Sequence, residues 1–151
     1  MSFLLLAVAS VGCRPTGRTT SGLDVPEPRA FSDAVVAVVV EDNPTGIYRK
    51  MEARFRKDVP EAQMRPALDQ IYAQYGGRPL EAVFKSEATG QKVYPDGDTK
   101  PLQRFWYAVS TTTEPMGKYF LIVEVVPDGA GLACAGFSIV SFPAGSPPWL
   151  N

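Results

Sequence analysis

Three side chains are candidates for acid–base chemistry: the carboxylates Asp69 and Glu124 and the phenol of Tyr72. Both acids interrupt otherwise apolar segments, and a carboxyl in an apolar cavity has a raised pKa, which suits it to exchange protons near neutral pH. A tyrosine hydroxyl nearby would donate a hydrogen bond to an oxyanion. However, helical periodicity places Asp69 on a polar side, and Glu124 shares a strand face with Phe120 and Ile122. An ordinary surface or ion-paired acid is the simpler interpretation of both.

The chain contains no histidine. Its absence excludes the Ser/His/Asp and Cys/His triads, the commonest general base and every histidine-containing zinc site. Asp96 and Asp98 in "YPDGDTKP" have the spacing of calcium ligands, but the downstream bidentate Glu of an EF-hand loop is missing. We therefore expect a turn at this position, no metal site and no cofactor.

Aromatic residues are consecutive at Phe105, Trp106 and Tyr107, in a segment with strong strand propensity. Successive side chains of a strand point to opposite faces, so rings are expected on both faces of the sheet. Core packing is the ordinary explanation. The alternative is a binding surface for a protein or a small ligand on whichever face the helices leave uncovered.

The chain begins with an uncharged, largely apolar block from Phe3 to Gly12. Its length fits the hydrophobic region of an export signal, about 7 to 15 residues, and falls short of the roughly 20 that span a bilayer. The block ends in "SVGC", which resembles the lipobox of bacterial lipoproteins. The resemblance implies that residues 1–12 are a signal peptide and that Cys13 becomes the lipidated N-terminus. Its acyl chains would anchor the protein to a membrane of the cell envelope, on the periplasmic or outer-surface side.

Two alternatives to lipidation remain. "AVAS" offers a signal-peptidase site after Ala9, which would release a secreted soluble protein, and an uncleaved apolar N-terminus is the third interpretation. If Cys13 is acylated, Cys134 has no disulfide partner. We expect Cys134 to be a buried, inert thiol.

Composition indicates one domain: the 151 residues are 45% hydrophobic and 21% charged. The formal charge of −1 gives no electrostatic footprint for nucleic acid. Residues 13–30 begin at the cysteine that the lipobox resemblance implies is lipidated, and their richness in Pro, Gly, Thr and Ser predicts a flexible linker that reaches about 20 to 25 Å. The folded domain is expected at 31–143 and a Pro-rich tail at 144–151.

Helices are expected in the first half of the domain. Residues 31–41 fit a helix with Ser32 as its N-cap, or a buried strand because the valine run is β-branched. Residues 46–58 read as one amphipathic helix, whose apolar residues recur every four positions: Ile47, Met51 and Phe55. Residues 64–75 form the clearest helix, which Gly76 and Gly77 end.

Beyond Gly77 the apolar period changes from 3.6 to 2, and four strand-like segments follow: 79–90, 101–113, 117–129 and 131–143. Short turns join them, which predicts an antiparallel meander. Helices followed by such a meander make an α+β fold in which the helices cover one face of a curved sheet.

This order resembles the nuclear transport factor 2-like, or cystatin-like, superfamily of cone-shaped α+β domains, which is common among small bacterial lipoproteins. The features that carry the likeness are Glu41-Asp42, Ile47-Tyr48, Phe55, the Met64 to Tyr75 helix with Gly76-Gly77, and the last three strands. The resemblance implies a pocket between sheet and helices. We expect a non-catalytic domain that binds a ligand or a protein. The alternatives are a metal-independent enzyme that uses carboxylates and tyrosines, and a structural homodimer.

Overall fold

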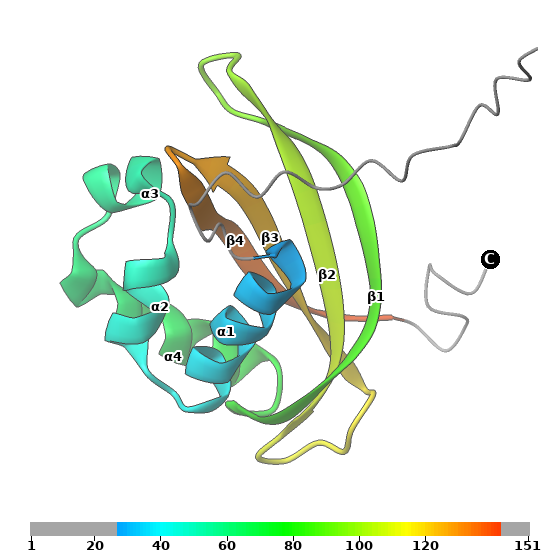
Figure 1. The fold of residues 1–151 in the computed structure, drawn as a ribbon. Helices are drawn as coiled ribbons and strands as arrows, with labels where there is room; N and C mark the ends of the chain where they lie inside the picture. Colours follow the sequence, from blue (N-terminus) through cyan, green and yellow to red (C-terminus); the bar gives the residue numbers. More distant parts are fainter. Residues whose placement is uncertain (1–26, 143–151) are drawn as a thin grey trace, which may run out of the picture.

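The computed structural model describes residues 27–142 (Figure 1). Three predicted features lie outside the described residues: the signal peptide 1–12, the lipidation site Cys13 and the Pro-rich tail 144–151. The helices are α1 (Pro28–Val40), α2 (Pro44–Lys50), α3 (Ala53–Asp58), the 3₁₀ turn η1 (Glu61–Gln63) and α4 (Met64–Gln74). The strands are β1 (Pro79–Val93), β2 (Thr99–Thr111), β3 (Tyr119–Asp128) and β4 (Gly131–Ser141).

The four strands form one antiparallel sheet in the order β1-β2-β3-β4. The predicted meander and the α+β class are therefore confirmed. The long strands β1 and β2 bend, and the helices lie on one side of the sheet (Figure 1). Among residues 27–142, no helix is long and apolar enough to cross a bilayer.

The core lies between the helices and one face of the sheet. Alternate residues of the central strands point to this face, so Phe105 of β2 and Leu121 of β3 meet Val35 and Val39 of α1. All four side chains are at most 1% exposed. Burial of each contributes about 1.5 to 3 kcal/mol, so packing holds the helices in place more than helix propensity does.

Helix α1 confirms the helical alternative for residues 31–41, but it begins earlier than predicted. Pro28 occupies its first turn, where the fixed φ of proline favours a helix start. Ser32 is therefore not the N-cap. It is a buried residue within the helix, and the Tyr107 hydroxyl lies 2.9 Å from its Oγ. The same hydroxyl donates to Asp33 Oδ1 at 2.8 Å.

The single amphipathic helix predicted over 46–58 is wrong. Helix α2 ends at Lys50, and Met51 and Glu52 are extended, with ψ of 149° and 153°. Met51 pairs with Cys134 on the edge of β4, and the Glu52 N–H donates to the Cys134 carbonyl at 2.9 Å. The edge of β4 thus supplies a backbone hydrogen bond in place of a helical one. The break turns Glu52 away from the polar face that a continuous helix would give it.

Helix α4 agrees with the prediction, including its end. Gly76 and Gly77 have φ of 75° and 100°, which is the left-handed region that favours glycine. A Cβ on Gly76 would lie 2.6 Å from Thr113 Oγ1, so the chain passes close to the β2–β3 hairpin there.

Candidate functional site

A groove of about 490 Å³ lies where α1, α2 and the start of α3 meet the β3–β4 hairpin. Small-molecule sites are usually clefts of about 300 to 1,000 Å³, so the groove has the size of a ligand site. Its lining combines apolar and basic side chains: Phe31, Val38, Gly46, Arg49, Lys50, Met51, Arg56, Asp128, Leu132 and Ala133.

The apolar part of the lining comes from three elements. Helix α1 contributes Phe31 and Val38, the α2–α3 connection contributes Met51, and β4 contributes Leu132 and Ala133. Met51 and Ala133 are only 5% and 4% exposed, so they belong both to the groove and to the packed interior. An apolar chain laid against this lining would leave water.

The basic part of the lining consists of Arg49, Lys50 and Arg56. Arg49 and Arg56 are exposed, and the half-buried Lys50 places its Nζ 5.5 Å from the Phe31 ring centre. Within residues 27–142, no carboxylate forms an ion pair with any of the three. Within the described part of the chain, the positive charge of the groove is therefore not balanced by an ion pair.

Asp128 is the carboxylate of the lining, and both of its oxygens already have partners. Its Oδ2 accepts a hydrogen bond from the Ala53 N–H at 2.8 Å, and its Oδ1 lies 3.6 Å from Lys100 Nζ. These contacts tie the end of β3 to the start of α3. They also neutralise the acid without using the basic residues of the groove.

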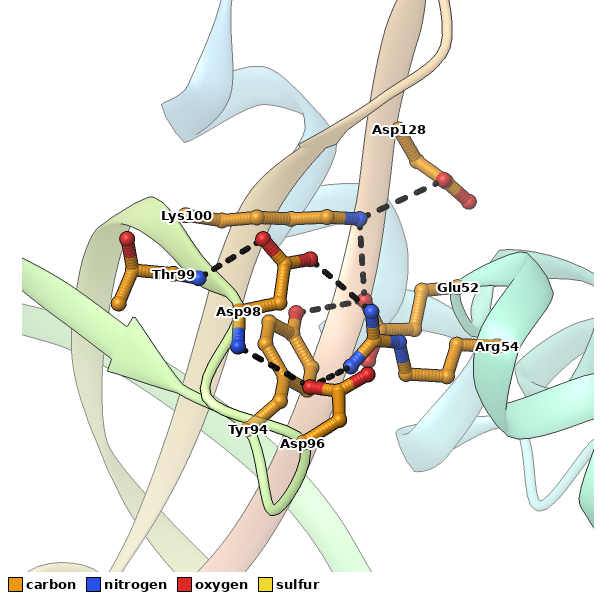
Figure 2. Close-up of polar contacts among 8 residues, drawn as sticks. All are labelled: Glu52, Arg54, Tyr94, Asp96, Asp98, Thr99, Lys100 and Asp128. Atoms are coloured by element: carbon orange, nitrogen blue, oxygen red, sulfur yellow. Dashed lines mark hydrogen bonds and ion pairs between the residues drawn. The ribbon is translucent and has the colours of Figure 1, made fainter.

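A network around Glu52 adjoins the groove (Figure 2). The Glu52 side chain is 5% exposed, and its Oε2 accepts a hydrogen bond from the Tyr94 hydroxyl at 2.7 Å. Lys100 Nζ lies 3.5 Å from the same oxygen, so Lys100 links Glu52 to Asp128. Burial, and then the hydrogen bond to Glu52, raise the pKa of Tyr94 well above its usual value.

Arg54 closes the network on its outer side. Its guanidinium lies 4.0 Å from the Tyr94 ring centre and binds Asp96 at 3.1 Å and Asp98 at 2.9 Å. The Asp98 N–H also donates to Asp96 Oδ1, and this bond, with Arg54, lowers the pKa of Asp96. The predicted turn at "YPDGDTKP" is confirmed. In the described part of the chain, no three His, Cys, Asp or Glu side chains form a group that could hold a metal ion.

Together these contacts position the groove. Glu52 and Arg54 flank the start of α3, and their partners lie on the β1–β2 hairpin. The segment from the end of α2 through α3 supplies Lys50, Met51 and Arg56 to the lining. The network therefore holds that segment against the sheet and fixes the basic side of the groove.

The structure does not bring the predicted acid–base residues together. Asp69 is exposed on α4 and pairs with Arg65 at 3.5 Å. Tyr72 lies in the core, and its hydroxyl has no hydrogen-bond partner among the described residues. Burial, and then the charge of Asp42, raise its pKa to about 12.

Glu124 is an ion-paired acid on the face of β3 opposite to the core residues Leu121 and Val123. It accepts hydrogen bonds from Lys92 Nζ at 2.6 Å and from Arg104 Nη2 at 2.6 Å. Burial opposes ionisation, but the two cations hold the pKa of Glu124 below its usual value. A general acid at neutral pH needs a raised pKa instead, so this arrangement fits the simpler interpretation of Glu124.

The three consecutive aromatic residues do not share one surface. Phe105 and Tyr107 are core residues, 1% and 2% exposed, as the core-packing interpretation expects. Trp106 is half-buried on the opposite face, with the Arg104 guanidinium 5.9 Å from its ring. Cys134 is fully buried, and burial raises the pKa of its thiol to about 12, which agrees with the inert thiol expected.

Sequence reasoning missed both the groove and the Glu52 network. The basic residues of "YRKMEARFRKD" are obvious in the sequence, but a continuous amphipathic helix assigns them to an ordinary solvated face. No Pro or Gly marks the break at Met51 and Glu52. The high density of basic residues was the signal that the sequence offered. The sequence did not show that these residues lie beside an apolar groove.

Comparison of the chain with protein-family models, curated proteins and solved structures gives no match. A function for this chain is therefore argued from its own residues.

Proposed function

We propose that the protein is a lipid-anchored domain of the cell envelope that binds a small ligand in the groove without catalysing a reaction on it. The observation that carries ligand binding is the 490 Å³ groove, whose lining is apolar on one side and basic on the other. The "SVGC" junction supports the anchor at Cys13. Helices on one face of a curved meander support membership of the nuclear transport factor 2-like or cystatin-like superfamily.

The chemistry of the lining favours binding over catalysis. Arginine and lysine are positively charged hydrogen-bond donors without an acceptor, so Arg49, Lys50 and Arg56 suit the binding of an anion rather than the removal of a proton from it. Asp128 is held by Lys100 and the Ala53 N–H. The lining residues that the structure describes therefore offer charges for binding and a carboxylate that already has partners.

A metal-independent enzyme is the second candidate, and one observation favours it. Glu52 and Tyr94 are a carboxylate and a phenol 2.7 Å apart, which is the combination such an enzyme needs. Glu52 is, however, only 4% exposed, and Arg54 covers the Tyr94 ring. A substrate would reach the pair only after Arg54 moves, so ligand binding in the open groove is the better supported function.

The anchor is tested by the intact mass of the protein extracted from membranes of a bacterial host. We expect loss of residues 1–12 and a gain of acyl mass on Cys13. Cys13→Ala should abolish both and leave the membrane fraction depleted of the protein. Cys134→Ala is the matched control, because it removes the other cysteine and should keep the acyl mass. Full-length, unacylated wild-type chain in the cytosol would refute the anchor.

Ligand binding is tested by native mass spectrometry of the same protein after its micelle is stripped in the gas phase. We expect a non-covalent adduct that denaturation removes. Leu132→Trp fills the groove and should abolish the adduct while leaving the acyl mass unchanged. Identical native and denatured masses would contradict a ligand in the groove.

A further inference from the structure

We propose that the ligand of the groove is an anionic amphiphile, a molecule with one carboxylate or phosphate headgroup and an apolar chain. This inference rests on the proposed function of the groove as a ligand site. It assigns the headgroup to Arg49, Lys50 and Arg56, and the chain to the apolar side of the lining.

The charge argument depends on which basic residues are already occupied. Seven of the thirteen lysines and arginines among residues 27–142 pair with a carboxylate: Arg29, Arg54, Arg65, Lys92, Lys100, Arg104 and Lys118. Of the six that do not, three line one groove together: Arg49, Lys50 and Arg56. Three neighbouring cations repel one another, and an anion placed among them relieves that repulsion. Guanidinium groups also bind carboxylate and phosphate in a bidentate manner.

Asp128 limits how much negative charge the groove accepts. It lies in the same lining and stays ionically paired to Lys100 at 3.6 Å. A ligand with several anionic groups would bring one of them against this carboxylate. A single headgroup on the side of Arg49 and Arg56 avoids the repulsion.

The apolar side requires a second part of the ligand. Phe31, Val38 and Leu132 line the groove beside the basic residues, and a purely polar anion would leave them wet. An alkyl chain would cover them, and each methylene taken out of water strengthens binding by up to about fourfold. Lys50 connects the two sides, because its Nζ lies 5.5 Å from the Phe31 ring.

The test is isothermal titration calorimetry on the full chain carrying Cys13→Ala, so that the protein's own acyl chains do not compete. Decanoate and decyl phosphate, below their critical micelle concentrations, are the probes. Decyl glucoside supplies the same chain without charge, and inorganic phosphate supplies the charge without a chain. We expect the two anionic amphiphiles to bind at least tenfold more tightly than either control.

Arg49→Gln/Arg56→Gln should weaken binding of decyl phosphate at least tenfold, and both side chains are exposed, so the variant should fold. Lys85→Gln is the control for lost charge, because Lys85 lies on β1 and does not line the groove. Equal binding of decyl glucoside and decyl phosphate would overturn the anionic class and keep the groove as a ligand site. Failure of every probe that has a chain would overturn both.

A headgroup of this chemistry could belong to a free amphiphile or to a bilayer lipid, and sedimentation with vesicles distinguishes the two. Retention on phosphatidylglycerol vesicles, lost in Arg49→Gln/Arg56→Gln and missing on phosphatidylcholine vesicles, assigns the ligand to the bilayer. Binding of decyl phosphate without retention on either vesicle assigns it to a free molecule. Retention that the double variant leaves unchanged would contradict the proposal.

Discussion

Glu52 and Glu124 are both neutralised by cations, but the fold arranges this in two different ways. Glu124 lies directly opposite Arg104 in the β2–β3 register, so one partner follows from strand pairing alone. Glu52 lies between two helices, and its partners Tyr94 and Lys100 come from the distant β1–β2 hairpin.

The two sites adjoin through a pair of lysines. Lys92 and Lys100 are opposite each other in the β1–β2 register, so their side chains leave the same face. Lys92 binds Glu124, and Lys100 binds Glu52 and Asp128. Three carboxylates therefore balance the charges of two neighbouring lysines.

Burial is the main physical difference between the two acids. The Glu52 side chain is 5% exposed and the Glu124 side chain is 17% exposed, with Arg104 at 42%. Solvent around the Glu124 site screens its charges, whereas water reaches Glu52 poorly. We therefore expect loss of Glu52 to cost more stability than loss of Glu124.

The largest expected effect is that of Glu52→Ala. It leaves the Tyr94 hydroxyl without its acceptor and Lys100 with Asp128 alone, so the free energy of unfolding should fall by about 3 kcal/mol. Urea unfolding followed by circular dichroism measures the change. Glu124→Ala is the matched control. A smaller loss for Glu52→Ala than for the control would reverse the comparison.

Tyr94→Phe separates the hydrogen bond from the charge at the same site. The ring stays beneath Arg54, and only the hydroxyl is lost, so the expected loss at pH 7 is about 1 to 2 kcal/mol. The pKa of Tyr94 is raised in the folded state from its ordinary value of 10.0. Its stabilising contribution is therefore fully present below pH 10 and is lost as the pH rises above it.

Removal of the Tyr94 hydroxyl should make the free energy of unfolding less sensitive to pH above pH 10. Tyr72 and Tyr107 also have raised pKa values, so part of the alkaline loss should remain in Tyr94→Phe. Urea unfolding at pH 8 to 11.5 measures the slope. An unchanged slope would mean that Tyr94 does not keep its proton through this range.

The same comparison explains which parts of the molecule were predictable. Glu124 stood out in the sequence because a charged residue within an apolar strand needs a partner, and strand register supplied one. The meander was predictable for a similar reason, since period-2 alternation and short turns are local signals. The helix end at Gly76 and Gly77 was equally local.

Glu52 and the groove depended on contacts between distant segments. The spacing of Ile47, Met51 and Phe55 favoured one helix, and the edge of β4 broke it by pairing with Met51. That pairing is invisible without the sheet in place. The extended conformation of Met51 and Glu52 thus decided how the Glu52 and Arg56 side chains are oriented. It thereby also decided where the basic side of the groove lies.

The smallest expected effect is that of Glu124→Gln. The substitution preserves the shape of the side chain and removes the charge that Lys92 and Arg104 share. Because the site is partly exposed, the free energy of unfolding at pH 7 should fall by about 1 kcal/mol or less.

The two cations hold the pKa of Glu124 below its ordinary value of 4.5. Its contribution is therefore present above that value and is lost as the pH falls through the lower folded-state pKa. Thermal unfolding of wild type and Glu124→Gln at pH 7 and at a series of pH values below 4.5 measures this contribution: the two proteins should differ at pH 7, and the difference should shrink as the pH falls. A difference that persists undiminished in acid would contradict this prediction, because it would show that the stabilisation does not depend on the charge of Glu124.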